Sequence, residues 1–267
     1  MPRYLTLIIA AGLAGLLAAT IVSAQEETPV PATVPLRHDL RFLVRPTLMG
    51  LVPPADEQGY GEAFIRVLES GPDLLKVRYE IKERRENEEG PAETDVPPVR
   101  IRRGVIDVHG CESGLGMHPL LFWPDGDWST ATGLLWVPRD SFRELKETGG
   151  CDWSIDYRVA GETERALTGY LEEALPDARR AKPELRLELV GEPAMYPCWI
   201  NGERLALPGL RAVDSQGLAD YWILDDPANP LVLKLTFIPP EEESTGGDAE
   251  LGLIEAGAGY AVVEVDF

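Results

Sequence analysis

The feature that most constrains the fold is a series of short apolar–polar alternations, separated by turn signals, that fills the chain from Leu185 onward. The run LRLEL at 185–189 alternates strictly, which predicts a half-buried strand. Asn201-Gly202 stands between CWI and ERLAL, and an Asn-Gly pair in that setting signals a type I′ hairpin. ADYWILDD, PLVLKLTFI and YAVVEVDF follow as further strands. Strands joined by short turns favour an antiparallel sheet.

The first two thirds of the chain mix strand and helix patterns. Alternation and apolar runs predict strands at 40–44, 74–82, 99–108, 132–137 and 151–158. Apolar residues of 60–68 recur at i, i+3, i+4, i+7 and i+8, the spacing of one helix face ended by Gly71-Pro72.

A second helix is expected at 138–148. Ser141 and Glu144 fit a capping box, Phe142 and Leu145 would face the core, and Gly149 would stop the helix. Residues 162–175 also show helical spacing. The expected fold is therefore α+β, a curved antiparallel sheet or half-barrel with two or three short helices.

The N-terminus has the order of residues found in a secretory signal. Arg3 precedes an uncharged run, and the small residues Val22-Ser23-Ala24 follow, so cleavage is expected after Ala24. An uncleaved membrane anchor is the alternative, because the run is just long enough to span a bilayer. Either way the chain is expected to be exported, to the periplasm or fully secreted, and no other segment predicts a membrane span.

The expected domain layout has four parts: a signal peptide at 1–24, a Pro-rich linker at 25–37, an α+β lobe at 38–180 and an all-β meander lobe at 181–267. One continuous domain over both lobes is the alternative. The net charge of −20 makes nucleic acid and anionic headgroups poor partners. No glycine-rich phosphate loop follows a strand, so no cofactor is expected.

Reactive side chains concentrate in HGCESGLGMH at 109–118. In an oxidising compartment Cys111 is expected to pair with Cys151, leaving Cys198 as a buried free thiol. Under that interpretation the loop is a stapled turn. Two alternatives use the same loop: a hydrolase site of His109, Ser113 and His118, or a metal site.

The metal alternative would use His109, Cys111 and His118, with Met117 or Asp107 as a fourth ligand. Such a set suits zinc or copper, although its spacing matches no known finger.

Two other motifs carry weaker alternatives. Asp125-Gly126-Asp127 could bind calcium, although EF-hand spacing is absent. Trp123 and Trp128 flank this motif and are the expected exposed aromatics, whereas strand-borne tryptophans are expected in the core. The adjacent acids of LDDPANP at 224–230 are expected to form a turn with local hydrogen bonds.

The stretch from Asn201 to Leu235, with its Asn-Gly hairpin, aromatic strand, LDDPANP turn and leucine-rich strand, resembles a pattern in uncharacterised exported bacterial proteins. TGLLWVPRDSFRELKETG looks like their strand-plus-helix segment. The architecture is similar to the half-barrel of periplasmic lipoprotein carriers. The resemblance implies no functional residue, because its motifs specify turns.

The expected function is that of a non-enzymatic protein of a bacterial envelope, which binds a hydrophobic ligand or an envelope partner on a concave sheet face. The residues expected on that face are the inward-pointing apolar positions of the last meander: Trp222, Leu224, Leu231, Leu233 and Leu235. Plain core packing is the alternative for each of them.

Overall fold

The computed structural model describes residues 33–47, 51–52, 59, 61–84, 99–120, 123–155, 185–217, 219–238 and 259–267. Four expected features lie wholly or mostly outside these residues: the signal peptide at 1–24, the first part of the linker, the helical pattern at 162–175 and the boundary between the two expected lobes at 180–181. Within the described part, no helix is long and apolar enough to cross a membrane.

The described chain is mostly β, so the expected α+β class with two or three helices is wrong. Twelve strands join one sheet system. The first five are β1 (Arg41–Thr47), β2 (Ala63–Ser70), β3 (Leu74–Arg84), β4 (Val99–His109) and β5 (Trp128–Thr130). The others are β6 (Gly150–Trp153), β7 (Leu185–Leu189), β8 (Ala194–Ile200), β9 (Glu203–Asp214), β10 (Ala219–Leu224), β11 (Val232–Phe237) and β12 (Gly259–Asp266). The one helix among the described residues is α2 (Arg139–Thr148).

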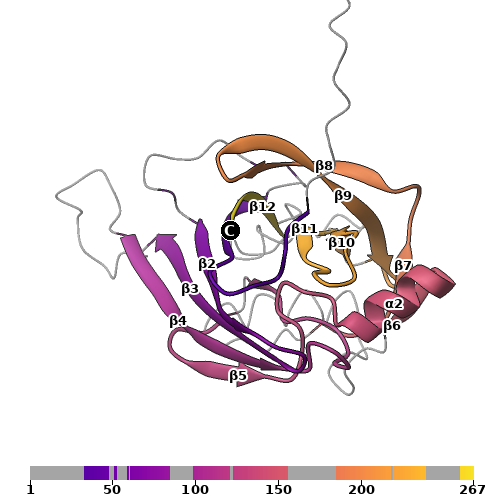
Figure 1. The fold of residues 1–267 in the computed structure, drawn as a ribbon, viewed down its shortest axis with the longest axis horizontal. Helices are drawn as coiled ribbons and strands as arrows, with labels where there is room; N and C mark the ends of the chain where they lie inside the picture. Colours follow the sequence, from indigo (N-terminus) through magenta and orange to yellow (C-terminus); the bar gives the residue numbers. More distant parts are fainter. Residues whose placement is uncertain are drawn as a thin grey trace, which may run out of the picture. The chain divides into compact units, whose positions relative to one another are not determined.

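Strands β8 to β12 close into a five-stranded barrel (Figure 1, orange to yellow). Each strand runs antiparallel to the one before it, so with an odd number of strands the first and last must run parallel. β8 and β12 do pair in parallel, at Trp199 with Glu264 and at Ile200 with Val265. The closure is therefore a short parallel ladder rather than a full-length antiparallel one.

The Asn-Gly hairpin prediction is confirmed at the start of this barrel. Asn201 and Gly202 have φ angles of 49° and 81°, the left-handed values that a type I′ turn needs at both positions. The turn fixes the register of β8 on β9, with Ile200 opposite Glu203 and Trp199 opposite Arg204.

The remaining strands extend the barrel on two sides. β1 pairs with β12, and β2, β3 and β4 follow as an antiparallel meander; on the other side β7 pairs with β9, and β6 with β7. Strands from both predicted lobes thus share one sheet, and residues 31–267 form one compact unit.

The helix predicted at 60–68 is wrong, because this segment contains β2. Ala63, Ile65 and Val67 are buried while Phe64 is exposed, an alternation that fits a strand between β1 and β3. Two of the three buried residues are β-branched, which favours a strand. The helical spacing and the strand alternation coexist in residues 63–68, and pairing with β1 and β3 decides between them.

Helix α2 is confirmed, but its predicted capping box is wrong. Pro138 is the N-cap, and no side chain caps the helix. The free N–H groups of Arg139 and Asp140 instead donate to the carbonyl oxygens of Cys111 and Glu112, at 3.0 and 2.9 Å. The predicted C-terminus is confirmed, since Gly149 adopts the left-handed conformation with φ 83°.

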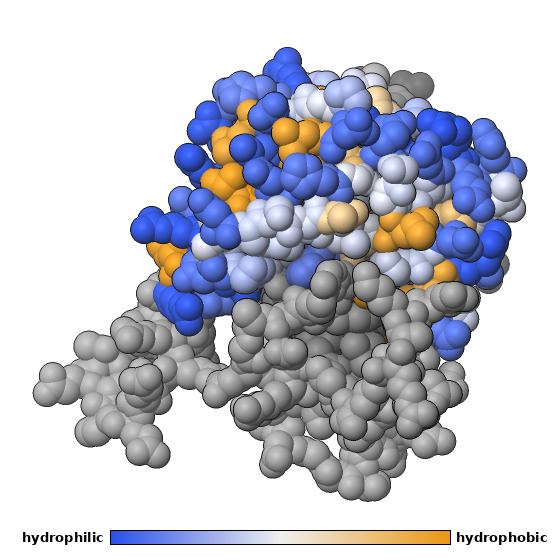
Figure 2. Space-filling view, turned by 90° about the horizontal axis from the view of Figure 1, so that it is seen from below, coloured by the Kyte–Doolittle hydropathy of each residue, from blue (hydrophilic) through white to orange (hydrophobic). Residues whose placement is uncertain are grey.

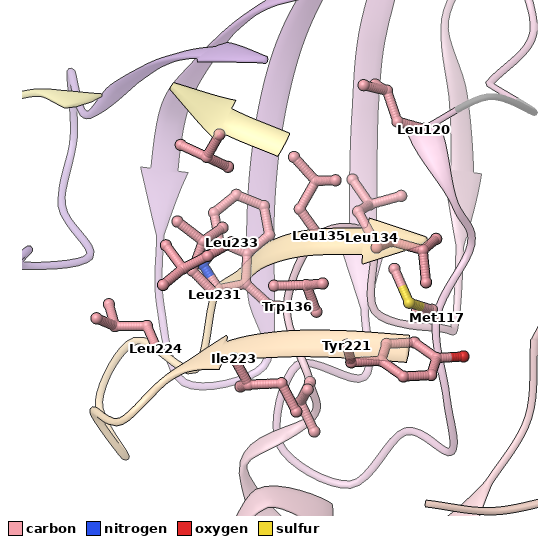
Figure 3. Close-up of a cluster of buried hydrophobic side chains, with 14 of the residues drawn as sticks. Met117, Leu120, Leu134, Leu135, Trp136, Tyr221, Ile223, Leu224, Leu231 and Leu233 are labelled. Atoms are coloured by element: carbon pink, nitrogen blue, oxygen red, sulfur yellow. The ribbon is translucent and has the colours of Figure 1, made fainter. Parts of the chain in front are cut away.

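The strand predicted at 132–137 is also wrong, because TGLLWV makes only isolated bridges. It is nevertheless buried, and it covers the barrel strands β10 and β11 (Figure 3). Val232 donates its N–H to the Leu135 carbonyl at 2.6 Å, and the Trp136 indole donates to Asn229 Oδ1 at 2.7 Å.

Asn229 also ties the end of the predicted linker to this core. Its Nδ2 donates to the carbonyl of Val34 at 2.6 Å, and Val34 is fully buried. The last residues of the expected 25–37 linker therefore belong to the folded unit. The turn predicted around Asp226 is confirmed, with Asp226 Oδ1 accepting from the Ala228 N–H at 2.9 Å.

Candidate functional site

The loop at 109–118 makes structural contacts with α2 and with Ser154. Its carbonyls cap α2, the Glu112 carboxylate accepts from Arg139 at 3.0 Å, and the Met117 N–H donates to the Ser154 carbonyl at 3.0 Å. Gly116 has no room for a side chain, because a Cβ there would lie 1.8 Å from the same Ser154 oxygen. Backbone packing thus accounts for the composition of this loop.

The predicted reactive residues of the loop lie in different surroundings. His109 and Ser113 are exposed, whereas His118 is buried, with its ring centroid 4.8 Å from that of Trp128. Within the described part of the chain, no group of three or more His, Cys, Asp or Glu residues could hold a metal ion. The described residues of this loop therefore show no candidate metal centre, and His118 of the hydrolase alternative differs from His109 and Ser113 in burial.

The predicted disulfide between Cys111 and Cys151 is not formed, and all three cysteines are free thiols. Cys111 follows β4, while Cys151 lies within β6 opposite Leu187 of β7. Burial raises the pKa of Cys111 to about 11 and that of Cys151 to about 12. Cys198 is buried, as expected, and burial raises the pKa of its thiol to about 12.

The Asp125-Gly126-Asp127 motif binds backbone rather than presenting a calcium site. Asp125 Oδ1 accepts the Arg103 N–H at 3.0 Å, and Asp127 Oδ1 accepts the Val105 N–H at 2.8 Å. Both N–H groups belong to the part of β4 that precedes its pairing with β5, which covers residues 106–108. The carboxylates thus complete this part of the strand edge, a common need of exposed strand edges.

The tryptophan predictions hold in part: Trp136 and Trp153 are buried as expected, whereas Trp123 and Trp199 differ from the expectation. Trp123 is fully buried and donates its indole N–H to the His118 carbonyl at 3.0 Å, and Trp128 is partly buried against the core. Trp199, which as a strand-borne tryptophan was expected in the core, is 50% exposed. The half-exposed tryptophan is therefore on the barrel and not beside the acidic turn.

Four of the five predicted ligand-face residues are core. Leu224, Leu231, Leu233 and Leu235 are at most 1% exposed. In Figure 3 the first three lie with Tyr221 and Ile223 in one cluster that packs under the TGLLWV segment. Trp222 differs, because on β10 it points away from Tyr221 and Ile223.

A groove of about 720 Å³ lies on the other side of β10 and β11, and we name it the barrel groove. Its apolar lining consists of Leu43, Val52, Tyr196, Pro197, Cys198, Trp199, Trp222, Ala261, Val262 and Val263. Its charged lining consists of Arg45, Arg204, Lys234 and Glu264. The volume falls within the range of small-molecule sites, roughly 300 to 1,000 Å³.

Strand register explains why these residues meet. Trp222 is opposite Lys234, Lys234 is opposite Ala261, and Ala261 is opposite Arg45. Directly opposed residues share one face of a sheet, so these four side chains form a row across β10, β11, β12 and β1. A second row crosses the closure, where Trp199 is paired with both Arg204 and Glu264.

The groove opens where β11 and β8 diverge along one edge of β12. β1 occupies the opposite edge along the length of β12, while β11 pairs at 259–261 and β8 pairs at 264–265. Tyr196 stands at this divergence, and its hydroxyl lies 3.2 Å from the Leu233 carbonyl and 2.9 Å from the Val262 carbonyl. Its ring centroid lies 5.7 Å from that of Trp222.

The charges around the groove are unevenly paired. Arg45 is bound to Glu62 at 3.0 Å, and Arg211, next to Trp222, is bound to Asp220 at 2.7 Å. Neither Lys234 nor Arg204 forms an ion pair with any carboxylate of the described residues. Partial burial lowers the pKa of Lys234, against the opposing effect of Asp220.

The rest of the described surface offers a less defined site. The face in Figure 2 is mostly hydrophilic, with apolar residues in small separate patches. A second hollow, of about 390 Å³, lies beside Arg78, Glu80 and Arg103. It has little apolar surface, because β3 and β4 present polar side chains there. The barrel groove is therefore the candidate site.

Of the groove residues, the sequence analysis singled out only Trp222 as a ligand contact. Lys234 interrupts the apolar run PLVLKLTFI, and that interruption was the available signal that β11 has a second, more polar face. Comparison with known proteins adds no assignment: the sequence matches no protein family, and neither the curated proteins nor the solved structures gave a significant match.

Proposed function

We propose that this chain is an exported, non-enzymatic binding protein that holds a small, largely apolar ligand in the barrel groove. The observation that carries the proposal is the groove itself, whose lining combines Trp199 and Trp222 with aliphatic residues such as Val262 and Val263. Binding pockets are typically concave, apolar and aromatic, with few polar groups that orient the ligand. The proposal therefore keeps the expected hydrophobic ligand but assigns it to the opposite face of β10 and β11.

The exposure of Trp199 supports this assignment. An indole that is half exposed on a strand exposes apolar surface to water, and covering it with a ligand recovers that hydrophobic free energy. The same strand carries Pro197, which cannot donate a hydrogen bond from its backbone. A ligand there would contact a ring and an apolar strand edge rather than pair as an added strand.

The test is a titration with N-phenyl-1-naphthylamine, an uncharged apolar fluorophore. The wild-type protein should bind it saturably, and Trp199→Ala should weaken binding about tenfold, the cost of losing roughly 1.4 kcal/mol of aromatic contact. Because Trp199 is half exposed, its truncation should leave folding intact, which far-UV circular dichroism checks.

Met195→Ala is the matched control. Met195 lies on the same strand and is 40% exposed, but it does not line the groove. Its truncation should leave probe affinity unchanged. Absence of saturable binding by the wild-type protein would refute the proposal, and equal losses in both variants would remove the groove as the site.

A further inference from the structure

We infer that the ligand of the barrel groove is an amphiphile with one anionic group, a carboxylate, sulfonate or phosphate monoester, and that Lys234 binds this group. The inference rests on the proposed function, because it names the chemical class of ligand for the same groove. It goes beyond it by dividing the groove into an apolar part and a cationic part.

The position of Lys234 is the first support. Its direct row partners Trp222 and Ala261 are apolar groove residues, so Lys234 lies between an aromatic and an aliphatic side chain. A partly buried cation without a carboxylate partner retains most of its desolvation cost. An anionic ligand group would supply the missing partner in a place where water is partly excluded.

The groups that face Lys234 favour an anion over a cation. Asp220, two residues before Trp222 on β10, is the carboxylate whose charge acts on Lys234, and its Oδ2 already binds Arg211 from β9 at 2.7 Å. At the barrel closure, Arg204 from β9 forms no ion pair with a carboxylate of the described residues. Arg204 and Glu264 from β12 both line the groove.

Arg45 from β1 is held by Glu62 at 3.0 Å, so this pair adds little net charge. Lys234 and Arg204 against Glu264 leave the groove with a local excess of one positive charge.

The net charge of −20 does not cancel this local excess. Charges separated by more than about 8 Å are largely screened at physiological salt, so the groups within the groove dominate a bound anion's energy. The acidic exterior slows the approach of anions instead, which should make the association rate rise with salt.

The experiment compares two probes that share one apolar body. N-phenyl-1-naphthylamine is uncharged, and 8-anilinonaphthalene-1-sulfonate is the same ring system with a sulfonate. The wild-type protein should bind the sulfonate about tenfold more tightly, the effect expected of a hydrogen bond to a charged group. Dodecanoate should displace the sulfonate probe and inorganic phosphate should not, because phosphate lacks the apolar body.

Lys234→Met tests the residue, and Lys76→Met is the matched control. Methionine keeps the unbranched stem of Lys234 and removes its charge, so the preference for the sulfonate should fall to about one. Lys76 lies on β3, bound to Asp107 at 3.2 Å and outside the groove, and its substitution should leave the preference unchanged.

The possible outcomes separate the two proposals. Equal binding of the two probes by the wild-type protein overturns the anionic ligand while the groove remains a binding site. A sulfonate preference that survives Lys234→Met overturns the role of Lys234. Displacement by inorganic phosphate overturns the amphiphile, and binding of neither probe overturns the proposed function itself.

Discussion

At the scale of single residues, burial decides the chemistry of the cysteines. Burial raises the pKa of Cys111 to about 11 and the pKa values of Cys151 and Cys198 to about 12. The thiolate, rather than the thiol, attacks electrophiles and binds metals. These side chains are therefore protonated near neutral pH and act as small apolar groups that fill the core.

The first prediction concerns thiol counts and rates. Denatured, unreduced protein should yield three iodoacetamide-reactive thiols, because all three cysteines are free. In the native protein at about pH 8, Cys111 should react roughly a hundredfold more slowly than an unburied thiol, since a pKa two units higher leaves a hundredth of the thiolate. The native rate should climb with pH toward about 11, the pKa of Cys111. A count of one thiol would instead support the disulfide expected from the compartment.

At the scale of secondary structure, local pattern predicted those elements whose partners are close in sequence. The Asn-Gly turn specifies that Trp199 lies opposite Arg204, so this pair of groove residues could be derived from the sequence alone. β2 could not, because helical and strand spacings fit it equally and its partners β1 and β3 decide. The strand prediction at 132–137 was wrong because a short apolar run is equally compatible with a buried irregular segment.

The contact between β4 and the turn at 125–127 depends on one glycine. Gly104 lies under the Asp125–Asp127 turn, and a Cβ there would lie 2.0 Å from the carbonyl oxygen of Gly126. It would also lie 2.9 Å from the hydroxyl of Tyr79, which donates to the carbonyl of Pro124. The turn approaches the strand this closely only because position 104 has no side chain.

Gly104→Ala should therefore lower the free energy of unfolding by about 2 kcal/mol or more, since the obstructing atom belongs to the backbone and cannot rotate away. Gly71→Ala is the control, because a Cβ there would meet only the Leu74 carbonyl at an ordinary 3.6 Å. Urea unfolding of both variants measures the difference. Similar stabilities for the two variants would mean that the turn does not rest on β4.

At the scale of the whole molecule, barrel closure is the feature that no local pattern could predict. Its parallel ladder joins residues 199–200 to residues 264–265 and contains only two residue pairs. The Tyr196 hydroxyl strengthens this closure, since it reaches the carbonyls of Leu233 and Val262 where β11 and β8 diverge. The groove exists because of this divergence, so the binding site and the weakest seam of the barrel coincide.

Tyr196→Phe should then lower the free energy of unfolding by about 1 to 2 kcal/mol, because it removes the buried hydrogen bonding of the Tyr196 hydroxyl to the carbonyls of Leu233 and Val262. Tyr260→Phe is the matched control on the neighbouring strand. The Tyr260 hydroxyl is fully buried and has no hydrogen-bond partner among the described residues, so its removal should be neutral or stabilising. Urea unfolding at neutral pH, where burial keeps both phenols protonated by raising their pKa values, measures both. If Tyr260→Phe proved the more costly substitution, the closure would not depend on the Tyr196 hydroxyl, and the groove would need another support.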